Sequence, residues 1–432
     1  MVQLSIKNFG PISLGYKSND GFFEIKQCSV FIGPQGSGKS CVVKLISLFS
    51  WLEKKLVANS LEEKIESKEF IQKIFRYHGI FDYINKETEI KYKGNAYNFI
   101  LNDETLKATR KKNDYVRPKV LYIPADRSFC TAIKNPGKIT GLPENTFEFL
   151  LDFTDAELGL KDKIFFIPIN GFCFSYDENR KQAFLIDDKK EYKIDVSYAS
   201  SGILSALPLT LTTAYYSGFL SVKPITESID QVIKKRNEAF EQLSKIQSVL
   251  DNLEVIDKNV PESKIVQQYK VLNSLGNELK NLEKTVKNPQ SILSKDINSR
   301  LINIVEEPEQ NLFPEAQADV LYYLIQCMNS GAVLGGQNSL VISTHSPYVI
   351  EALNNSIYAK RLLDSGKKID GILEPNELVS YDDVAAYKLS DGTIESIKND
   401  EIKQIDASYL DSCSERIRMM YSKLEDIEFS NE

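Results

Sequence analysis

The residues from Gly33 to Cys41 combine glycines, a lysine and hydroxyl side chains at a spacing that can bind phosphate. Glycines let consecutive backbone N–H groups curl around phosphate oxygens. Lys39 would reach the β- and γ-phosphates of a nucleotide, and the Ser40 hydroxyl would ligate Mg²⁺. An apolar strand pattern precedes this loop and a helical pattern follows it, so the positive end of the helix would face the same anion. The predicted nucleotide-binding residues are Gly33, Pro34, Gln35, Gly36, Ser37, Gly38, Lys39, Ser40 and Cys41.

Two carboxylates follow a second apolar segment. Residues 301–305 are mostly apolar and end on Glu306 and Glu307. A strand that stops on acids places negative charge at the carboxyl edge of a sheet, where α/β folds bind ligands. Glu306 would hold Mg²⁺ through a water, and Glu307 would orient and deprotonate the attacking water. Read alone, the same segment also fits a strand end with an ordinary acidic turn.

A histidine stands at the end of a third apolar segment. Residues 340–343 lead into Thr344-His345-Ser346, and the chain has only two histidines. An imidazole at this place could donate a hydrogen bond to a transferring γ-phosphate. The other histidine, His78, has no such context, and we expect it at the surface.

A Ser-Ser-Gly segment, Ser200 to Gly202, opens the uncharged stretch 203–222. A helix that begins this way offers free N–H groups and hydroxyls to an anion, although Ser201 read alone fits an ordinary helix cap equally well. The uncharged stretch has about the length of a membrane span. Because it contains Pro208 and several Ser and Thr residues, we expect a buried helix.

The chain divides into three predicted domains, residues 1–225, 226–290 and 291–432. The first has an alternating strand at 2–6, a helix through about 55, a hairpin near 88–101, a strand at 120–124 and alternating strands over 164–198. The last again has α/β character. Over 226–290, apolar residues recur at three- and four-residue steps on both sides of a break at 260–263. This favours an antiparallel coiled-coil hairpin, and an ordinary packed helix pair is the alternative.

Composition narrows the classes of protein further. The chain has 432 residues, 42% hydrophobic content and a net charge of −7, which argues against broad nonspecific binding to DNA or an anionic membrane. A local basic run over 107–119 fits a solvated loop. The six cysteines form no C-x-x-C pair, and Met1 leads directly into a strand pattern. We therefore expect reduced thiols, no signal peptide and a cytoplasmic protein without membrane contact.

In their order along the chain, these motifs resemble an ABC-type ATPase. The phosphate loop, the Ser-Ser-Gly motif, the Glu-Glu-Pro-Glu strand end and the Ser-Thr-His-Ser-Pro segment carry the resemblance. The branch is that of SMC, RecF and OLD proteins, and especially the stand-alone ATPases of bacterial anti-phage operons such as PARIS and Septu. Residues 6–10 and 122–128 also look like that branch. The resemblance implies an α/β ABC-ATPase head, with a mixed sheet and an antiparallel β subdomain, into which the coiled-coil hairpin is inserted.

The resemblance implies the roles given above for the loop, the acids and His345. It also implies that Ser201 and Gly202 cap an ATP molecule held by a second subunit, and that Asn8 and Phe9 lie near the base. This chain departs from the family pattern at three places. The signature is Ser-Ser-Gly-Ile, the first acid of the strand end is Glu rather than Asp, and no clear glutamine loop is present. The candidates to replace that loop are Asp126 and Arg127.

If ATP lies between two subunits, hydrolysis requires a homodimer or a higher oligomer, with Mg²⁺ as cofactor. OLD relatives carry a nuclease domain after the histidine motif, whereas the acids after His345 lack that arrangement. We therefore expect a sensor ATPase of an anti-phage defence system that controls a separate effector, a nuclease or toxin. DNA or a phage protein is a further candidate partner. The alternatives are a RecF-like DNA-repair ATPase and an ATP-gated scaffold that sequesters a partner with little turnover.

Overall fold

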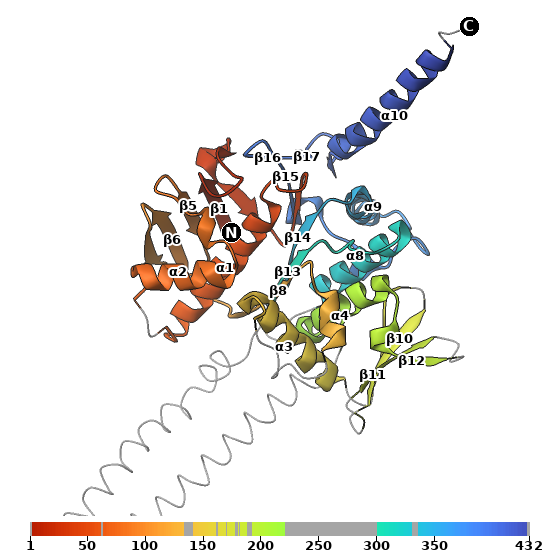
Figure 1. Ribbon diagram of the computed structural model, residues 1–432, viewed down its shortest axis with the longest axis horizontal. Helices are drawn as coiled ribbons and strands as arrows, with labels where there is room; N and C mark the ends of the chain where they lie inside the picture. Colours follow the sequence, from red (N-terminus) through yellow and green to blue (C-terminus); the bar gives the residue numbers. More distant parts are fainter. Residues whose placement is uncertain are drawn as a thin grey trace, which may run out of the picture. The chain divides into compact units, whose positions relative to one another are not determined.

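A seven-stranded mixed sheet carries the phosphate loop and both polar strand ends in this computed structural model (Figure 1). Its strand order is β2-β16-β15-β4-β14-β13-β8, and β15, β4, β14, β13 and β8 run parallel. The strand bounds are β2 Gly15–Tyr16, β4 Cys28–Ile32, β8 Pro118–Ile123, β13 Arg300–Glu306, β14 Ser339–Thr344, β15 Val384–Ser390 and β16 Thr393–Ser396. The α/β fold with a mixed sheet is thus confirmed.

The structure describes residues 2–61, 64–133, 141–160, 163–169, 171–177, 180, 182–187, 192–220, 300–330 and 336–429. The predicted coiled-coil hairpin, residues 226–290, lies outside these ranges. The described elements belong to one unit, formed by the chain segments before residue 221 and after residue 299.

The register of the central strands brings the candidate site together. In the parallel pairs, Glu306 lies opposite Ser343, and Thr344 lies opposite Ile32. The ends of β13, β14 and β4 therefore meet at one edge of the sheet. All five residues of β4 are buried, which is typical of a central parallel strand covered on both faces.

Two helices cover opposite faces of strand β13. Ile304 belongs to the apolar core that includes Val43 and Ile46 of helix α1, Lys39–Val57. The neighbouring Asn303 points the other way and donates to Thr213 Oγ1, 3.0 Å away, on helix α4, Ser201–Ser217. Because successive strand residues face opposite sides, α1 and α4 sandwich the sheet. The phosphate loop and the Ser-Ser-Gly motif begin these two helices.

Two antiparallel sheets complete the β structure, as predicted from the hairpin near 88–101 and the alternation over 164–198. The first has the order β3-β1-β5-β6-β7 and the second β12-β11-β10-β9, while β17 and β18 form a short pair. The bounds are β1 Val2–Lys7, β3 Phe23–Ile25, β5 Glu89–Lys93, β6 Tyr97–Asn102, β7 Thr105–Arg110, β9 Ile164–Phe166, β10 Phe172–Asp177, β11 Gln182–Asp187, β12 Lys193–Asp195, β17 Lys398–Asn399 and β18 Gln404–Ile405.

The remaining helices connect these sheets. The longer ones are α2 Lys68–Tyr77, α3 Glu144–Gly159, α8 Pro314–Asn329, α9 Pro347–Asp364 and α10 Ser408–Phe429. Short 3-10 turns are η1 Asn19–Gly21, η2 Phe81–Tyr83, η3 Ser128–Ala132, η5 Val196–Tyr198, η6 Pro375–Glu377 and η7 Tyr381–Asp383. None of the helices in the described ranges has the length and apolar character to cross a membrane. The expectation of a buried helix from residue 203 is confirmed by α4, most of which is buried.

The expectation that His78 lies at the surface was wrong. His78 is 4% exposed, because it continues the face of α2 that buries Ile71, Ile74 and Phe75. Its ring contacts Tyr77 and Tyr122 edge-on, and burial lowers the pKa of His78 to about 3.

The basic run over 107–119 is a solvated loop only in part, because residues 111–117 lie between strands and Lys107, Arg110 and Lys112 are exposed. Its ends belong to strands β7 and β8. Lys111 donates to the Gly94 carbonyl at 2.6 Å, and Lys119 donates to both oxygens of Asp152, at 2.6 and 2.7 Å. Because the ammonium groups of Lys111 and Lys119 are bonded within the fold, they are not free to attract a nucleic acid.

The described cysteines Cys28, Cys41, Cys130, Cys173 and Cys327 are buried, as expected.

Candidate functional site

The phosphate loop connects β4 to α1 through three glycines in left-handed backbone conformations. A Cβ on Gly33 would lie 2.2 Å from the Leu389 carbonyl oxygen, and one on Gly38 would lie 2.8 Å from a side-chain carbon of Ile12. Gly36 also has a positive φ of 75°, but no atom lies within 4 Å of its Cβ position. The loop therefore fits tightly against the fold at Gly33 and Gly38 and remains open at Gly36.

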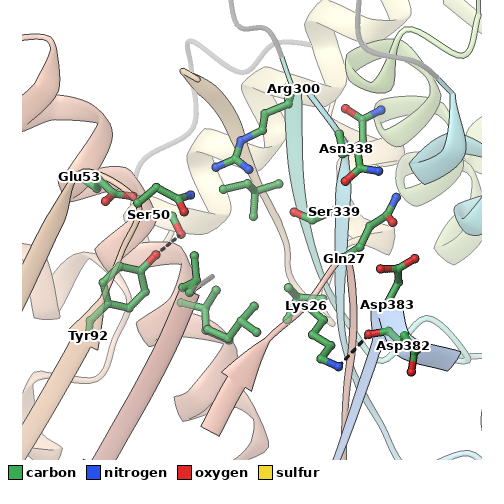
Figure 2. A pocket seen from close by; sticks show the side chains of 17 residues that line it. Lys26, Gln27, Ser50, Glu53, Tyr92, Arg300, Asn338, Ser339, Asp382 and Asp383 are labelled. Atoms are coloured by element: carbon green, nitrogen blue, oxygen red, sulfur yellow. Dashed lines mark hydrogen bonds between the residues drawn. The ribbon is translucent and has the colours of Figure 1, made fainter. Parts of the chain in front are cut away.

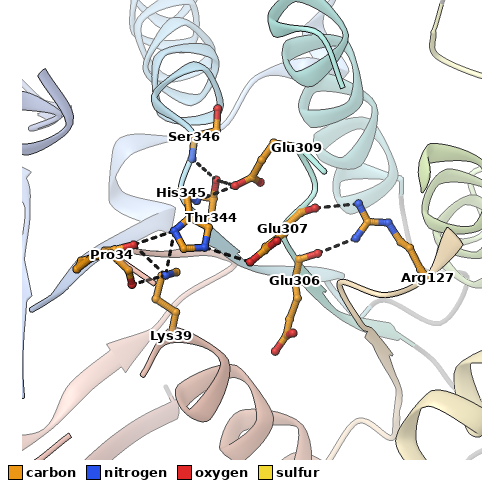
Figure 3. A network of polar contacts seen from close by, with 10 residues as sticks. Pro34, Lys39, Arg127, Glu306, Glu307, Glu309, Thr344, His345 and Ser346 are labelled. Carbon is orange, nitrogen blue, oxygen red and sulfur yellow. Dashed lines mark hydrogen bonds and ion pairs between the residues drawn. The ribbon is translucent and has the colours of Figure 1, made fainter. Parts of the chain in front are cut away.

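Lys39 lies at the centre of the loop. Its ammonium donates to the carbonyls of Gly33 and Pro34, at 2.8 and 2.9 Å, and lies 3.3 Å from His345 Nδ1 (Figure 3). Burial lowers the pKa of Lys39, while Glu307 and two further carboxylates oppose that shift. The loop thus holds a cation where a bound nucleotide would place its terminal phosphates.

Glu307 and His345 contact each other from neighbouring strand ends. His345 Nε2 lies 3.1 Å from Glu307 Oε1, and His345 Nδ1 lies 3.1 Å from the Gly33 carbonyl oxygen. The hydrogen bond from His345 lowers the pKa of Glu307, and nearby cations contribute in the same direction. The Glu307 carboxylate is therefore held in its ionised form, the form in which a general base acts.

Glu306 has the properties of a metal ligand. Its side chain is buried and bonds to the hydroxyls of Tyr122 and Ser40. One of its carboxylate oxygens, Oε1, is buried with no protein partner among the described residues. Burial raises the pKa of Glu306, so an ionised carboxylate here is stabilised by a cation. Carboxylate and hydroxyl oxygens are suitable ligands for Mg²⁺, so Glu306 and Ser40 together fit this ion.

Arg127 holds the turn that carries the two acids. Its Nε donates to the Ser205 carbonyl at 2.8 Å, its Nη1 to the Glu306 carbonyl at 2.7 Å and its Nη2 to the Glu307 carbonyl at 2.8 Å. Weaker bonds reach the carbonyls of Pro124 and Pro308, so all five guanidinium donors have partners. Burial lowers the pKa of Arg127 to about 10.

The expectation that Arg127 replaces the glutamine loop is thus wrong, because its donors are used within the protein. Asp126 is exposed, and for this residue the expectation stays a prediction.

Sequence reasoning also missed Glu309, whose Oε1 accepts from Thr344 Oγ1 at 2.8 Å and from the His345 amide at 2.7 Å. Glu309 thereby fixes the backbone that presents His345. The third acid of the Glu-Glu-Pro-Glu segment was the available signal.

The Ser-Ser-Gly motif begins helix α4 on an exposed face. Ser201 is exposed, and a Cβ on Gly202 would lie 3.0 Å from the Asn311 carbonyl oxygen, in the segment after β13. Tyr198, three residues before Ser201, is 82% exposed, and Phe313, two residues after Asn311, is 73% exposed. The helix start and its amides are therefore accessible from outside the chain.

Asn8 and Phe9 lie in the turn after β1. Phe9 is fully buried and contacts Phe75 and Tyr83 edge-on, so its ring is not available to stack on a base. Asn8 is partly exposed, donates to the Glu87 carbonyl at 3.2 Å and lines an open cavity of about 430 Å³. A contact between Asn8 and a base stays a prediction.

A cavity of about 460 Å³ lies elsewhere, near the amino ends of the central strands (Figure 2). Arg300 and Ser339 begin β13 and β14, and Gln27 precedes β4. Because Lys39, Glu307 and His345 lie at the carboxyl ends of these strands, this cavity is separate from the candidate site.

An α/β sheet with a phosphate loop at its carboxyl edge defines a P-loop nucleotide-binding fold. The AAA ATPase domain family matches residues 1–350, and the chain belongs to that family. No curated protein matches the chain significantly. Nineteen chains of solved structures match, among them the SmcHead bound to the C-winged helix domain of ScpA. That match has 9% identity and a TM-score of 0.37, and it covers 93% of this chain and 98% of the other. A likeness this low carries no argument about mechanism.

Proposed function

We propose that this protein binds ATP with Mg²⁺ and hydrolyses it to ADP and phosphate. The observation that carries the proposal is the convergence of Lys39, Glu307 and His345 at one sheet edge, joined by contacts of 3.3 Å or less. Glu306 ends strand β13 directly before Glu307, and its buried Oε1 has no partner among the described residues. Backbone N–H groups of residues 33–41 would cradle the phosphates, and Lys39 would exchange its loop carbonyls for phosphate oxygens.

Side chains of this protein would carry out the proton transfer, the contact with the γ-phosphate and the binding of Mg²⁺. Glu307, ionised and in contact with His345, would accept a proton from the attacking water. His345, held at its backbone by Glu309, would donate to the γ-phosphate. Ser40 and Glu306 would hold Mg²⁺, which when bound would neutralise charge on the phosphates.

The proposal includes a second subunit, which would complete each ATP site. It is supported by the exposed start of α4 at Ser201, near the exposed aromatic rings of Tyr198 and Phe313. Exposed aromatic residues around accessible helix amides are suited to an interface with an anion at its centre. In this arrangement Ser201 and Gly202 of one subunit would cap the ATP held by Lys39 of another, in a homodimer or higher oligomer.

Light scattering with ATP tests the shared site. At a protein concentration where the nucleotide-free protein is monomeric, a Glu307→Gln variant should bind ATP without hydrolysing it and should therefore increase in mass when ATP and Mg²⁺ are added. Lys39→Ala in the same background is the control that should not respond. If Glu307→Gln binds ATP but its mass does not change, the shared site is wrong.

The biological role belongs to the proposal as well. The order of the motifs supports a sensor ATPase of a bacterial anti-phage defence system that controls a separate nuclease or toxin. Expression of the native operon should protect cells from phage, and Glu307→Gln should remove protection by at least about tenfold in plaque counts. ATP-dependent DNA binding by the purified protein, without any effect on phage, would favour the RecF-like alternative instead.

A further inference from the structure

The last helix, α10, exposes large apolar side chains along its second half. Every described side chain from 418 to 428 is exposed. Among them, Met419, Met420 and Ile427 are each 61% exposed, Leu424 is 64% exposed and Tyr421 is 65% exposed. A helix gains most of its stability by packing an apolar face, so exposure of this kind indicates a surface that a partner covers.

The spacing of these residues identifies the kind of partner. Met420, Leu424 and Ile427 follow one another at steps of four and three residues, and the sequence continues this spacing back to Leu410. This is the a/d pattern of a two-stranded coiled coil, with Leu424 at an a position and Met420 at a d position. Met419 has the same exposure as Met420 but falls at position c, outside the seam.

The charges beside the seam indicate a second copy of the same helix. Lys423 falls at position g and Glu428 at position e of the next heptad. In a parallel, in-register pair, g of one helix faces e of the following heptad in the other, so Lys423 and Glu428 would form two equivalent ion pairs. In an antiparallel pair, g would face g, and both g positions in this stretch are basic.

We infer that α10 pairs with α10 of a second copy as a parallel coiled coil, without any need for nucleotide. The helix has 22 residues, and its a and d positions from Leu410 to Ile427 would form a seam roughly 27 Å long. A parallel pair has twofold symmetry, the symmetry of most homodimers. Two ATPase units joined in this way meet at a high effective concentration, so their engagement by ATP becomes intramolecular. This last consequence, unlike the pairing itself, rests on the proposed function.

The two adjacent methionines provide a matched test. Sedimentation of the full-length protein without nucleotide, over a concentration series, should show a monomer–dimer equilibrium. Met420→Glu should raise the dimer Kd by about tenfold or more, because it places a charge in the seam. Met419→Glu should leave the Kd within about twofold of the wild type. The inference is overturned if the wild type is a monomer throughout, or if both variants behave alike.

Exchange of charges tests the orientation of the helices. In the parallel pair, Lys423→Glu alone and Glu428→Lys alone should each weaken the dimer, because each brings like charges together. The double variant should restore it. In an antiparallel pair, Lys423→Glu would strengthen the dimer instead, and that result would overturn the parallel assignment.

A combined variant separates this inference from the proposed shared ATP site. Met420→Glu with Glu307→Gln should be monomeric without nucleotide and should dimerise when ATP is added. If it dimerises without ATP, the coiled coil is wrong. If it is monomeric without nucleotide, binds ATP and still stays monomeric, the coiled coil stands and the proposed shared ATP site is wrong.

Discussion

At the scale of single residues, the site depends on two side chains that hold the backbone of others. Glu307 adopts a left-handed conformation, with φ of 44°, which costs about 1 kcal/mol or more for a residue with a side chain. Arg127 offsets that cost through its bonds to the carbonyls of Glu306 and Glu307. Glu309 holds the backbone of His345 in place by accepting a hydrogen bond from its amide, at 2.7 Å. The geometry of the proposed catalytic residues is therefore maintained by groups that need not touch a nucleotide.

Arg127→Lys keeps the charge but loses the planar set of donors. Several buried carbonyls would lack partners, so we expect the free energy of unfolding to fall by about 2–4 kcal/mol. We expect kcat to fall by about 100-fold, since Glu307 is no longer fixed, while ATP affinity changes little because the phosphate loop is untouched. Urea unfolding, steady-state kinetics and binding of a fluorescent ATP analogue measure the three quantities.

Arg361→Lys on helix α9 is the control for this substitution. Arg361 also donates to a carbonyl, that of Ile402 at 2.8 Å, but in an exposed position. It should change neither stability nor turnover appreciably. A parallel loss of ATP affinity and kcat in Arg127→Lys would contradict a role limited to positioning.

At the scale of elements, helix α2 shows how an apolar face can include an ionisable residue. His78 is packed between the rings of Tyr77 and Tyr122, and its Nδ1 is buried without a partner among the described residues. Because burial lowers its pKa to about 3, the folded protein keeps this imidazole neutral where an unfolded chain would protonate it. The end of this helix is therefore a source of acid sensitivity outside the proposed catalytic residues.

The pH dependence of stability tests this interpretation. The folded pKa of His78 lies below the unfolded value of about 6.5, so its contribution is complete above pH 6.5 and is lost as pH falls toward 3. Between pH 7 and pH 5 the loss is about 2 kcal/mol. His78→Phe should remove this loss, and a cavity of about 30 Å³ beside the ring leaves room for the change.

Urea unfolding of the wild type and His78→Phe at both pH values gives the difference directly. Other buried groups titrate equally in the two proteins and cancel. The interpretation fails if both proteins lose the same free energy between pH 7 and pH 5.

At the scale of the whole molecule, helix α4 connects two proposed ATP sites. Ser205 of this helix accepts from Arg127, which also holds the turn of Glu307. Ser201, one turn earlier, is exposed and would face the ATP of a second subunit. A change at the neighbouring site thus has a short route, through the contacts of Arg127, to Glu307, the proposed general base of this subunit.

Complementation between two inactive variants tests the shared site at this scale. Lys39→Ala and Ser201→Arg should each abolish hydrolysis alone. In a mixed dimer, one site would combine an intact phosphate loop with an intact signature. Random assembly makes half of the dimers mixed, each with one of two sites intact, so co-expressed variants should regain about a quarter of wild-type activity. Activity no higher than that of either parent would show that Ser201 does not act across an interface.

The local sequence determined the strands, the phosphate loop and the ends of the strands that carry Glu306, Glu307 and His345. Each of these depends on residue types within about ten positions, through glycine conformations and runs of apolar residues. The parallel arrangement of the strands then placed their carboxyl ends together, and the register confirms it for Glu306 opposite Ser343.

Tertiary structure alone decided which polar groups face one another. Arg127 is 179 positions from Glu306, and Glu309 is 36 positions from His345, so no local pattern could reveal these contacts. The same holds for His78, whose burial depends on what α2 packs against. A buried polar group must find its partners wherever the folded chain brings them, and that requirement is met only by the complete fold.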